Sequence, residues 1–229
     1  MCLMSVIMSD DRLDHRKRLF VDMADVDLGE RVERLFHTAV KQPQPVLRQQ
    51  APWECHSGMC GSVIYDADEG RFKAWYMAGH WAEGHEHVQC LATSTDGIRW
   101  ERPELGLHEA LGSRRNNIVI PCSHHEGKDH WESMLKDPHD PDDQRRYKAL
   151  GWSSYDWDGP LAGIYSATSP DGLSWRHSPE PLFRYHPRPG TDDLGPVGDA
   201  QSLMVDSPRG RYVAFLRGVP ERLLSISED

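Results

Sequence analysis

The feature that most constrains this fold is an internal repeat with a long, constant period. The segment Ala92–Trp100 (ATSTDGIRW) recurs 75 residues later as Ala167–Trp175 (ATSPDGLSW). A second element precedes each copy and shows the same offset, with FKAWYMAG at Phe72–Gly79 and YKALGWSS at Tyr147–Ser154. A third copy of this upstream element is YVAFLRG at Tyr212–Gly218. Repetition of this kind predicts an array of equivalent structural units stacked against one another.

Each unit contains the signals of antiparallel strands joined by tight turns. Runs of hydrophobic and β-branched residues end at Gly, Pro and Asp clusters, as in Ser62–Asp66, Ser133–Asp137 and Ser202–Asp206, and such runs are typical of hairpins. Further strands are expected at Gln89–Thr93 and Gly163–Ala167. The fourth strand of a unit is expected to carry the tryptophan that follows the Asp-Gly turn, because glycine accepts the positive φ of hairpin turns.

Four antiparallel strands repeated radially form the blade of a β-propeller. The sequence therefore predicts an all-β fold with about three blades, at residues 51–120, 121–195 and 196–229, the last one incomplete. Residues 1–50 are expected to form a lead-in segment, in which Arg31–His37 fits either a strand or a short helix.

Composition narrows the class of protein and of partner. The chain has 229 residues and a net charge of -10, which argues against a nucleic-acid ligand because phosphates require a basic face. No apolar run approaches the ~20 residues of a membrane span. The apolar start, Met1–Met8, lacks the basic region and cleavage site of a signal peptide. A neutral ligand and no membrane partner are expected, and the location is either cytoplasmic or left open by the sequence.

The cysteines predict neither disulfides nor a zinc site. They are odd in number and contain no CxxC pair: Cys2, Cys55, Cys60, Cys90 and Cys122. Free thiols in a reducing compartment are the expected state, and no cofactor is predicted.

Two families share features of the sequence. Ser94–Trp100 and Ser169–Trp175 are similar to the Asp-box of sialidase-like propellers, but lack the residue between Asp and Gly. The second resemblance covers the chain from about residue 19. Its motifs, in order, are LFVD at Leu19–Asp22, PWE at Pro52–Glu54, GSVIYD at Gly61–Asp66, FKAWY at Phe72–Tyr76, TDGIRWERP at Thr95–Pro103, NNIV at Asn116–Val119, KDP at Lys136–Pro138, RYKAL at Arg146–Leu150 and RYVAFLR at Arg211–Arg217.

This order resembles bacterial proteins described as family 32 glycoside hydrolase N-terminal-like propellers, related to the family 32 and 43 sugar-cleaving enzymes. The resemblance implies a five-bladed propeller that is carbohydrate-active. Three carboxylates from the first strands of successive blades are then expected near the central axis. Glycoside cleavage itself requires two carboxyl groups that face the scissile bond.

The candidate catalytic residues follow from this resemblance. In the first blade the expected aspartate is absent from Cys55–Cys60, and the nearest carboxylate is Glu54. In the second blade Asp137 matches the aspartate of an Arg-Asp-Pro element, which the resemblance implies stabilises the transition state. Asp137 can equally be a turn residue before proline in an acidic loop. In the third blade Asp199 precedes the first strand where a general acid is expected, with Asp192 and Asp193 as competitors.

Aromatic and histidine side chains complete the predicted site. Trp81, Trp131 and Trp157 are expected in loops, where they offer a face to a sugar ring, whereas Trp75, Trp100 and Trp175 are assigned to packing. His85 and His125 lie in loop clusters near the expected mouth of the site. Neither histidine cluster has HExxH or zinc-ligand spacing, so no metal is predicted.

Two classes of function remain open from the sequence. One is a glycosidase that hydrolyses O-glycosyl bonds, and the other is a non-catalytic propeller that binds a glycan or a protein. Asp96 and Asp171 are expected to form turns and not to act in catalysis. Leu223–Asp229 resembles the start of a third turn motif, so the chain is expected to be part of a longer, five-bladed protein.

Overall fold

The computed structural model describes residues 35–54, 58–80, 86–121, 129–154, 156, 159–186, 197–218 and 222–227. The chain divides into two compact units, Met1–Lys41 and Gln42–Asp229. In the first unit the described residues, 35–41, contain neither helix nor strand. The second unit carries the strands and the candidate site.

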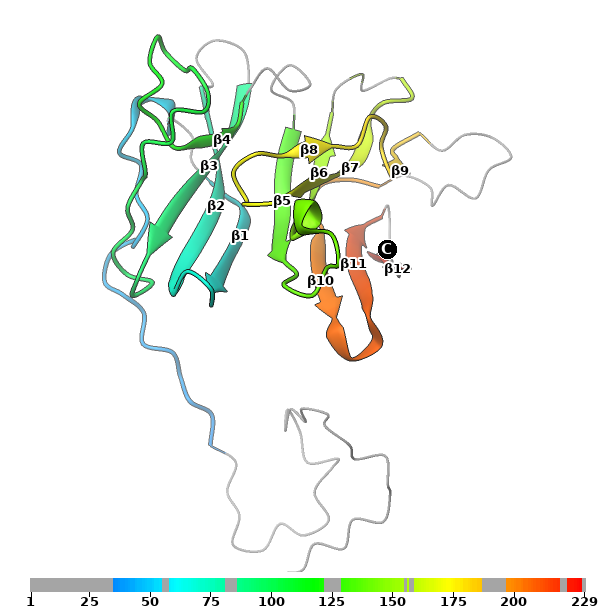
Figure 1. Cartoon of the computed structure of the whole chain (residues 1–229), viewed down its shortest axis with the longest axis horizontal. Coiled ribbons are helices and arrows are strands. Elements are labelled where there is room, and N and C mark those ends of the chain that lie inside the picture. Colours follow the sequence, from blue (N-terminus) through cyan, green and yellow to red (C-terminus); the bar gives the residue numbers. More distant parts are fainter. Residues whose placement is uncertain are drawn as a thin grey trace, which may run out of the picture. The chain divides into compact units, whose positions relative to one another are not determined.

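The second unit is built from three antiparallel sheets. The first sheet contains, in order, β1 (Gly58–Asp66), β2 (Arg71–His80), β3 (Glu86–Ser94) and β4 (Ile118–Ile120). The second sheet contains β5 (Asp129–Lys136), β6 (Tyr147–Ser153), β7 (Gly163–Ser169) and β8 (Arg176–His177), and β9 (Phe183–Arg184) also pairs with β7. The third sheet contains β10 (Ser202–Asp206), β11 (Arg211–Arg217) and β12 (Arg222–Ser227). The predicted all-β class is confirmed (Figure 1).

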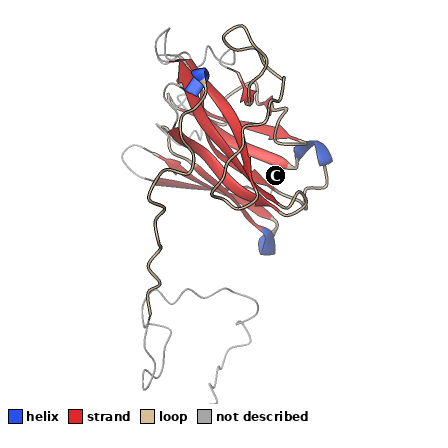
Figure 2. Ribbon diagram, turned by 90° about the vertical axis from the view of Figure 1, so that its left-hand side faces the viewer, coloured by secondary structure: helices blue, strands red, loops and turns tan. Residues whose placement is uncertain are grey.

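Helical structure in the described part of the chain is confined to single 3₁₀ turns. These are η1 (Pro52–Glu54), η4 (Asp143–Arg145) and η5 (Ser207–Arg209), as the colouring of Figure 2 shows. None of these turns is long or apolar enough to cross a lipid bilayer, within the residues that the structure describes.

The sequence repeat is reproduced in the register of the strands. Phe72 of β2 pairs with Ser94 of β3, and Tyr147 of β6 pairs with Ser169 of β7. In the third sheet Tyr212 pairs with Ser227. The prediction that Phe72, Tyr147 and Tyr212 begin equivalent second strands is therefore confirmed.

The predicted fourth strands are corrected by the structure. Trp100 lies outside any strand, and only its neighbour Glu101 bridges back to Thr93. The fourth strand of the first sheet is instead Ile118–Ile120, whose three residues are all buried. In the second sheet Trp175 precedes β8 and does not belong to it. Pairing resumes at the residue after each tryptophan: Glu101 pairs with Thr93, and Arg176 pairs with Thr168.

The two turns are held by the same hydrogen bonds. The Asp96 carboxylate accepts the amides of Ile98 (2.8 Å) and Arg99 (2.7 Å). The Asp171 carboxylate accepts those of Leu173 (2.8 Å) and Ser174 (2.9 Å). This confirms that both aspartates are turn-formers of the Asx type.

Successive sheets contact one another in a repeating way through their first strands, which run side by side in Figure 1. The Ser62 hydroxyl accepts the Met134 amide, and the Ser133 hydroxyl accepts the Leu203 amide, both at 2.8 Å. Within the described residues the three sheets do not close into a ring.

The apolar core lies between these sheets. One cluster joins the first and second sheets and contains Trp75, Leu91, Trp131, Tyr147 and Tyr165. Another joins the second and third sheets and contains Leu150, Trp152, Ile164, Ala214 and Leu216. The first and second sheets therefore each bury a face against the next sheet in the chain.

Candidate functional site

The three predicted catalytic acids do not lie together. Asp137 directly follows β5. Asp199 lies three residues before β10 and directly precedes Ala200, whose amide contacts Glu132 of β5. A strand rises about 3.3 Å per residue, so the five residues from Glu132 to Asp137 span roughly 17 Å. Glu54 instead contacts Tyr76 of β2 in the first sheet and Arg102 in the loop after β3. The three carboxylates bind different partners: Glu54 binds Tyr76 and Arg102, Asp137 binds Tyr212, and Asp199 binds Arg217.

Glu54 is a buried structural acceptor. Its side chain is fully buried and accepts four donors: the amides of Gln50 and Ala51, the Tyr76 hydroxyl (2.5 Å) and the Arg102 guanidinium (2.7 Å). Burial acts to raise the pKa of Glu54, but the hydrogen bonds from Arg102, Tyr76 and the two amides outweigh it and lower the pKa. The carboxylate ties the segment before β1 to β2 and to the loop after β3.

Asp137 makes a contact that the first sheet repeats. It accepts the Tyr212 hydroxyl at 2.6 Å, and Asp66, at the equivalent end of β1, accepts the Tyr147 hydroxyl at 2.6 Å. The Asp66 carboxylate also binds Lys136 and Lys73. In both cases an aspartate at the end of a first strand receives a tyrosine from the next sheet. This repetition identifies the Asp137 contact as part of the packing between sheets.

A different carboxylate, Glu132, lies in a setting that perturbs it strongly. Glu132 is in β5, and its Oε2 atom accepts the amides of Ala200 (2.8 Å) and Gln201 (3.2 Å) from the segment that leads into β10. Burial raises the pKa of Glu132 to about 7, and the two amides oppose this effect while the negative charge of Asp199 adds to it. Asp199 forms an ion pair with Arg217 of β11.

A histidine pair connects to these carboxylates through His130, which lies close enough to Asp199 to interact with its charge. The rings of His87 in β3 and His130 in β5 meet edge to face, with their centroids 4.5 Å apart. Burial lowers the pKa of His130, and the charges of Asp199 and Asp129 oppose that shift. Elements of all three sheets therefore converge on the Glu132 cluster, defined here as His87, His130, Glu132, Asp199 and Arg217.

The backbone around Glu132 explains how its side chain is aimed. The pairing of β5 with β6 shifts between Trp131 and Ser133, so Glu132 lies in a β-bulge, and bulges commonly redirect a side chain near a functional site. The amide that Glu132 binds belongs to Ala200, which has a φ of 70°. A non-glycine residue in the left-handed region costs on the order of 1 kcal/mol, and such strain concentrates at functional sites.

No sequence motif singles out Glu132. A pair of carboxylates is detected from sequence when the residues lie in one motif, but Glu132 and Asp199 are 67 positions apart in the chain. The bulge and the contact between sheets bring them together. Among the described residues no group of three or more His, Cys, Asp or Glu side chains is arranged to hold a metal ion.

The predicted ligand-binding residues fall into two groups. Trp81, His85, His125 and Trp157 lie outside the described residues. Trp131 was expected in a loop, and that placement is wrong: it lies in β5, its side chain is 2% exposed, and its ring stacks at 4.7 Å on His177. The alternating burial of β5 draws this indole into the core between the first and second sheets.

The tryptophans assigned to packing do pack. Trp75 is fully buried, and its indole Nε1 donates to the carbonyl of Gly172 at 2.9 Å. The Trp175 ring meets Trp75 edge to face at 6.4 Å. Trp100 packs against the cluster that contains Tyr76 and Cys90.

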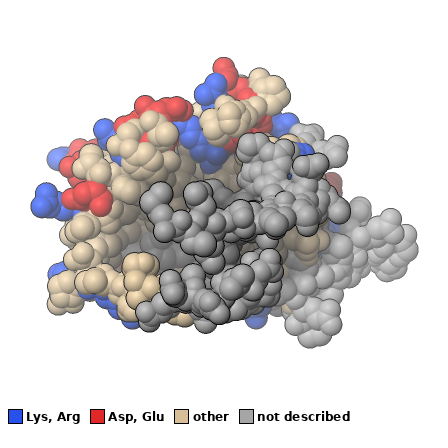
Figure 3. All heavy atoms as spheres, turned by 90° about the horizontal axis from the view of Figure 1, so that it is seen from below, with Lys and Arg blue, Asp and Glu red and all other residues tan. Residues whose placement is uncertain are grey.

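Charge on the outer surface is mixed in sign. On the face shown in Figure 3, acidic and basic side chains of the described residues are interspersed. Local ion pairs such as Arg209–Asp206 and Arg146–Asp143 join neighbouring charges. Such exposed pairs contribute little to stability.

Comparisons with known proteins give structural neighbours only. No protein-family model matches the chain. No curated protein matches it.

Among solved structures, the chain is similar to one described as a glycoside hydrolase, with a TM-score of 0.45 and 15% identity over 82% of this chain and 51% of that one. It is also similar to the β-fructofuranosidase of Schwanniomyces occidentalis complexed with fructosyl-erythritol (TM-score 0.43, 15% identity, 74% of this chain and 33% of that one). A protein of unknown function from Dyadobacter fermentans gives a TM-score of 0.46 at 17% identity, over 73% of this chain and 50% of that one. The chain spans about half or less of the length of these three structures.

Proposed function

We propose that the chain is part of a carbohydrate-active β-propeller, with its three sheets as consecutive blades and the Glu132 cluster as its ligand site. The repeated contacts support the fold. In the first sheet Ser62 and Asp66 accept hydrogen bonds from the following sheet, and in the second sheet Ser133 and Asp137 do the same. Equivalent contacts between equivalent units generate a radial array when the rotation between them is constant.

One observation carries the functional proposal: a carboxyl group with a pKa of about 7 stands beside a second carboxylate that is paired with an arginine. Glycoside hydrolysis uses two carboxyl groups in different protonation states, one as proton donor and one as nucleophile or base. We assign the proton donor to Glu132 and the charged partner to Asp199. The carbohydrate class follows from the resemblance of the sequence motifs to sugar-cleaving propellers.

A second candidate is a propeller that binds a glycan without cleaving it. Gly61 occupies the position of Glu132 in the first sheet, because Ser62 and Ser133 make the same contact with the following sheet, and Gln201 precedes the equivalent Ser202. Only one of three equivalent positions is therefore acidic. In this case Glu132 and Asp199 would act as hydrogen-bond acceptors for sugar hydroxyls.

The test measures turnover of a panel of nitrophenyl furanosides and pyranosides and, separately, binding to a glycan array. Glu132→Gln is expected to lower turnover at least 100-fold if the protein is an enzyme, because the proton donor is lost. The turnover of the unaltered protein should also fall as the pH rises through about 7, where Glu132 loses its proton. Under the second candidate no turnover is seen, and Glu132→Gln and Asp199→Asn each weaken glycan binding.

Asp137→Asn is the matched control, because it alters an aspartate whose contact is with Tyr212. It is expected to lower the melting temperature while the folded variant retains turnover or binding. The proposal fails if the protein neither cleaves nor binds any glycan tested, or if Asp137→Asn abolishes the signal while Glu132→Gln and Asp199→Asn leave it intact.

A further inference from the structure

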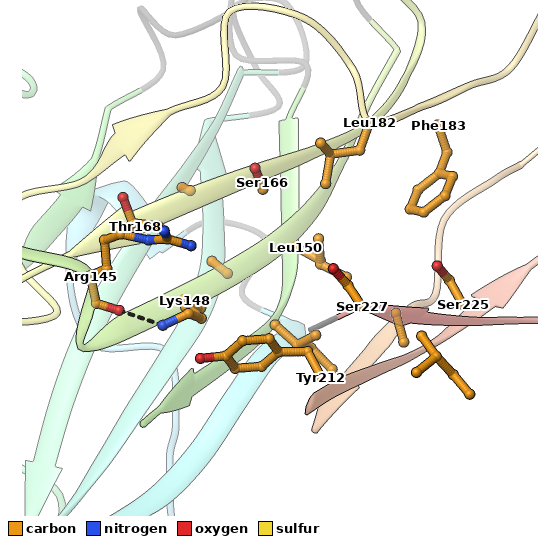
Figure 4. Close-up of a pocket in the computed structure, with 15 residues that line it drawn as sticks. Arg145, Lys148, Leu150, Ser166, Thr168, Leu182, Phe183, Tyr212, Ser225 and Ser227 are labelled. Atoms are coloured by element: carbon orange, nitrogen blue, oxygen red, sulfur yellow. Dashed lines mark hydrogen bonds between the residues drawn. The ribbon is translucent and has the colours of Figure 1, made fainter. Parts of the chain in front are cut away.

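A cavity of about 450 Å³ lies between the second and third sheets, away from the Glu132 cluster. Figure 4 shows side chains from both sheets along its walls. The second sheet and the segment after it supply Leu150, Ser166, Leu182 and Phe183, and the third sheet supplies Tyr212 and Ser225. The walls are mainly apolar, with hydroxyl groups at intervals and with Arg145 and Lys148 also in the lining.

The walls of this cavity are equivalent, through the repeat, to surfaces that meet between the first and second sheets. Tyr212 and Tyr147 pair in the same register with Ser227 and Ser169, so Ala214 corresponds to Ala149. On the opposite wall, Leu150 of β6 corresponds to Trp75 of β2. Each lies two residues after a lysine, Lys148 or Lys73, that occupies the same place in the register. The interface between the first and second sheets therefore shows which kind of segment packs against walls of this type.

The earlier interface is completed by the turn Ser169–Trp175. The carbonyl of Gly172 accepts the Trp75 indole at 2.9 Å, and Trp175 meets the same indole edge to face. Gly172 has a φ of +75°, and a Cβ atom there would lie 2.7 Å from Trp75 and 3.3 Å from Tyr147. The turn is thus fitted closely to the wall that carries Tyr147, and Leu173 and Trp175 pack on the shared core.

We propose that the cavity between the second and third sheets is a receptor for a turn of the form Asp-Gly-x-x-Trp. Such a turn presents a glycine to Tyr212, as Gly172 is presented to Tyr147, and places an indole in the apolar space in front of Leu150. The occupant follows from the equivalent interface one sheet earlier, where this same kind of turn fills the gap. The proposal is independent of the carbohydrate assignment, because it involves none of the residues of the Glu132 cluster.

The test uses a fluorescein-labelled peptide with the sequence of residues 170–175, PDGLSW, and the whole chain as receptor. The peptide omits Ala167–Ser169, because Ser225–Ser227 of β12 already occupy the equivalent places. Fluorescence anisotropy is expected to show saturable binding. The same peptide with alanine in place of tryptophan is expected to bind at least about tenfold more weakly, or about 1.4 kcal/mol, because the buried aromatic side chain is lost.

Two variants locate the binding. Leu182→Arg changes a wall residue that is 52% exposed and therefore tolerates a charge, and Ser166→Arg places a guanidinium inside the cavity. Each is expected to weaken peptide binding at least tenfold. Ser174→Arg is the matched control, because Ser174 is exposed and does not line the cavity. Melting curves establish that each variant is folded.

The proposal is overturned if the tryptophan and alanine peptides bind equally, or if neither wall variant changes binding. It is also overturned if the peptide does not bind and the wall variants instead abolish self-association in sedimentation, because a second copy would then occupy the cavity. Loss of glycan recognition in the Glu132 variants leaves peptide binding unchanged, so the two proposals fail separately.

Discussion

Residues of the same type have different roles here because their partners differ. Asp66 and Asp137 each receive a tyrosine hydroxyl from the following sheet, and the lysines and the tyrosine around Asp66 lower its pKa against the effect of burial. Glu132 receives only two backbone amides in the contacts described, and burial prevails to raise its pKa to about 7. The perturbation singles out Glu132 as the candidate functional carboxylate.

Glu132→Gln is expected to change the pH dependence of stability. The folded-state pKa of about 7 lies above the ordinary value of 4.5, so the stability linked to this proton is full below pH 4.5 and is lost as the pH rises through about 7. The variant should therefore gain free energy of unfolding relative to the unaltered protein between pH 5 and pH 8, by up to about 3 kcal/mol.

Urea titrations at several pH values measure this difference. Glu104→Gln is the control, because Arg115 lowers the pKa of this exposed carboxyl, and its variant should show no such gain at high pH. A constant difference between Glu132→Gln and the unaltered protein across this range would contradict the raised pKa.

Among the elements, the two Asp-Gly turns are alike in sequence but not in surroundings. Both glycines have positive φ, 71° at Gly97 and 75° at Gly172. A Cβ at Gly97 would lie 3.6 Å from Phe72, an ordinary contact, whereas one at Gly172 would lie 2.7 Å from Trp75. The first turn is therefore constrained mainly by its own backbone, and the second also by the neighbouring sheet.

Alanine at the two glycines separates these effects. Gly97→Ala is expected to lower the free energy of unfolding by about 1–2 kcal/mol, the cost of a left-handed non-glycine residue. Gly172→Ala should cost about 1–3 kcal/mol more, because the indole of Trp75 must move. Chemical denaturation of both variants measures the two losses, and equal losses would show that the second turn is not fitted against Trp75.

At the scale of the whole molecule, the third sheet exposes an apolar face. Met204, Phe215, Leu224 and Ile226 are each about half exposed, at 50%, 47%, 56% and 48%. They share one side of the sheet, because Phe215 pairs with Leu224, and Met204 and Ile226 both pair with Val213. In the first two sheets the equivalent side is covered by the following sheet, and contiguous apolar surface of this kind favours association.

The 229-residue chain is therefore expected to self-associate as its concentration rises. The double variant Phe215→Ser with Leu224→Ser should shift sedimentation toward the monomer with little change in melting temperature, since both side chains are already exposed. Val63→Ser, at a residue that is 49% exposed on the first sheet, is the control and should not change association. A chain that stays monomeric at high concentration would contradict this expectation.

The sequence by itself determined the all-β class, the positions of the second and third strands of each unit, and the role of Asp96 and Asp171. These features are local, because a short strand, a glycine with positive φ and an aspartate that binds its own turn depend on neighbours within a few residues. The internal repeat shows the same local pattern more than once.

Only the tertiary structure decided which carboxylates meet. Asp137 follows a first strand and binds Tyr212 of the next sheet, whereas Glu132 is aimed by a bulge at amides 68 and 69 positions further along the chain. The spacing of motifs does not reveal a bulge or the angle between two sheets. The sequence resemblance therefore pointed to Asp137 and not to Glu132. The setting that raises the pKa of Glu132 exists only once the second and third sheets have packed together.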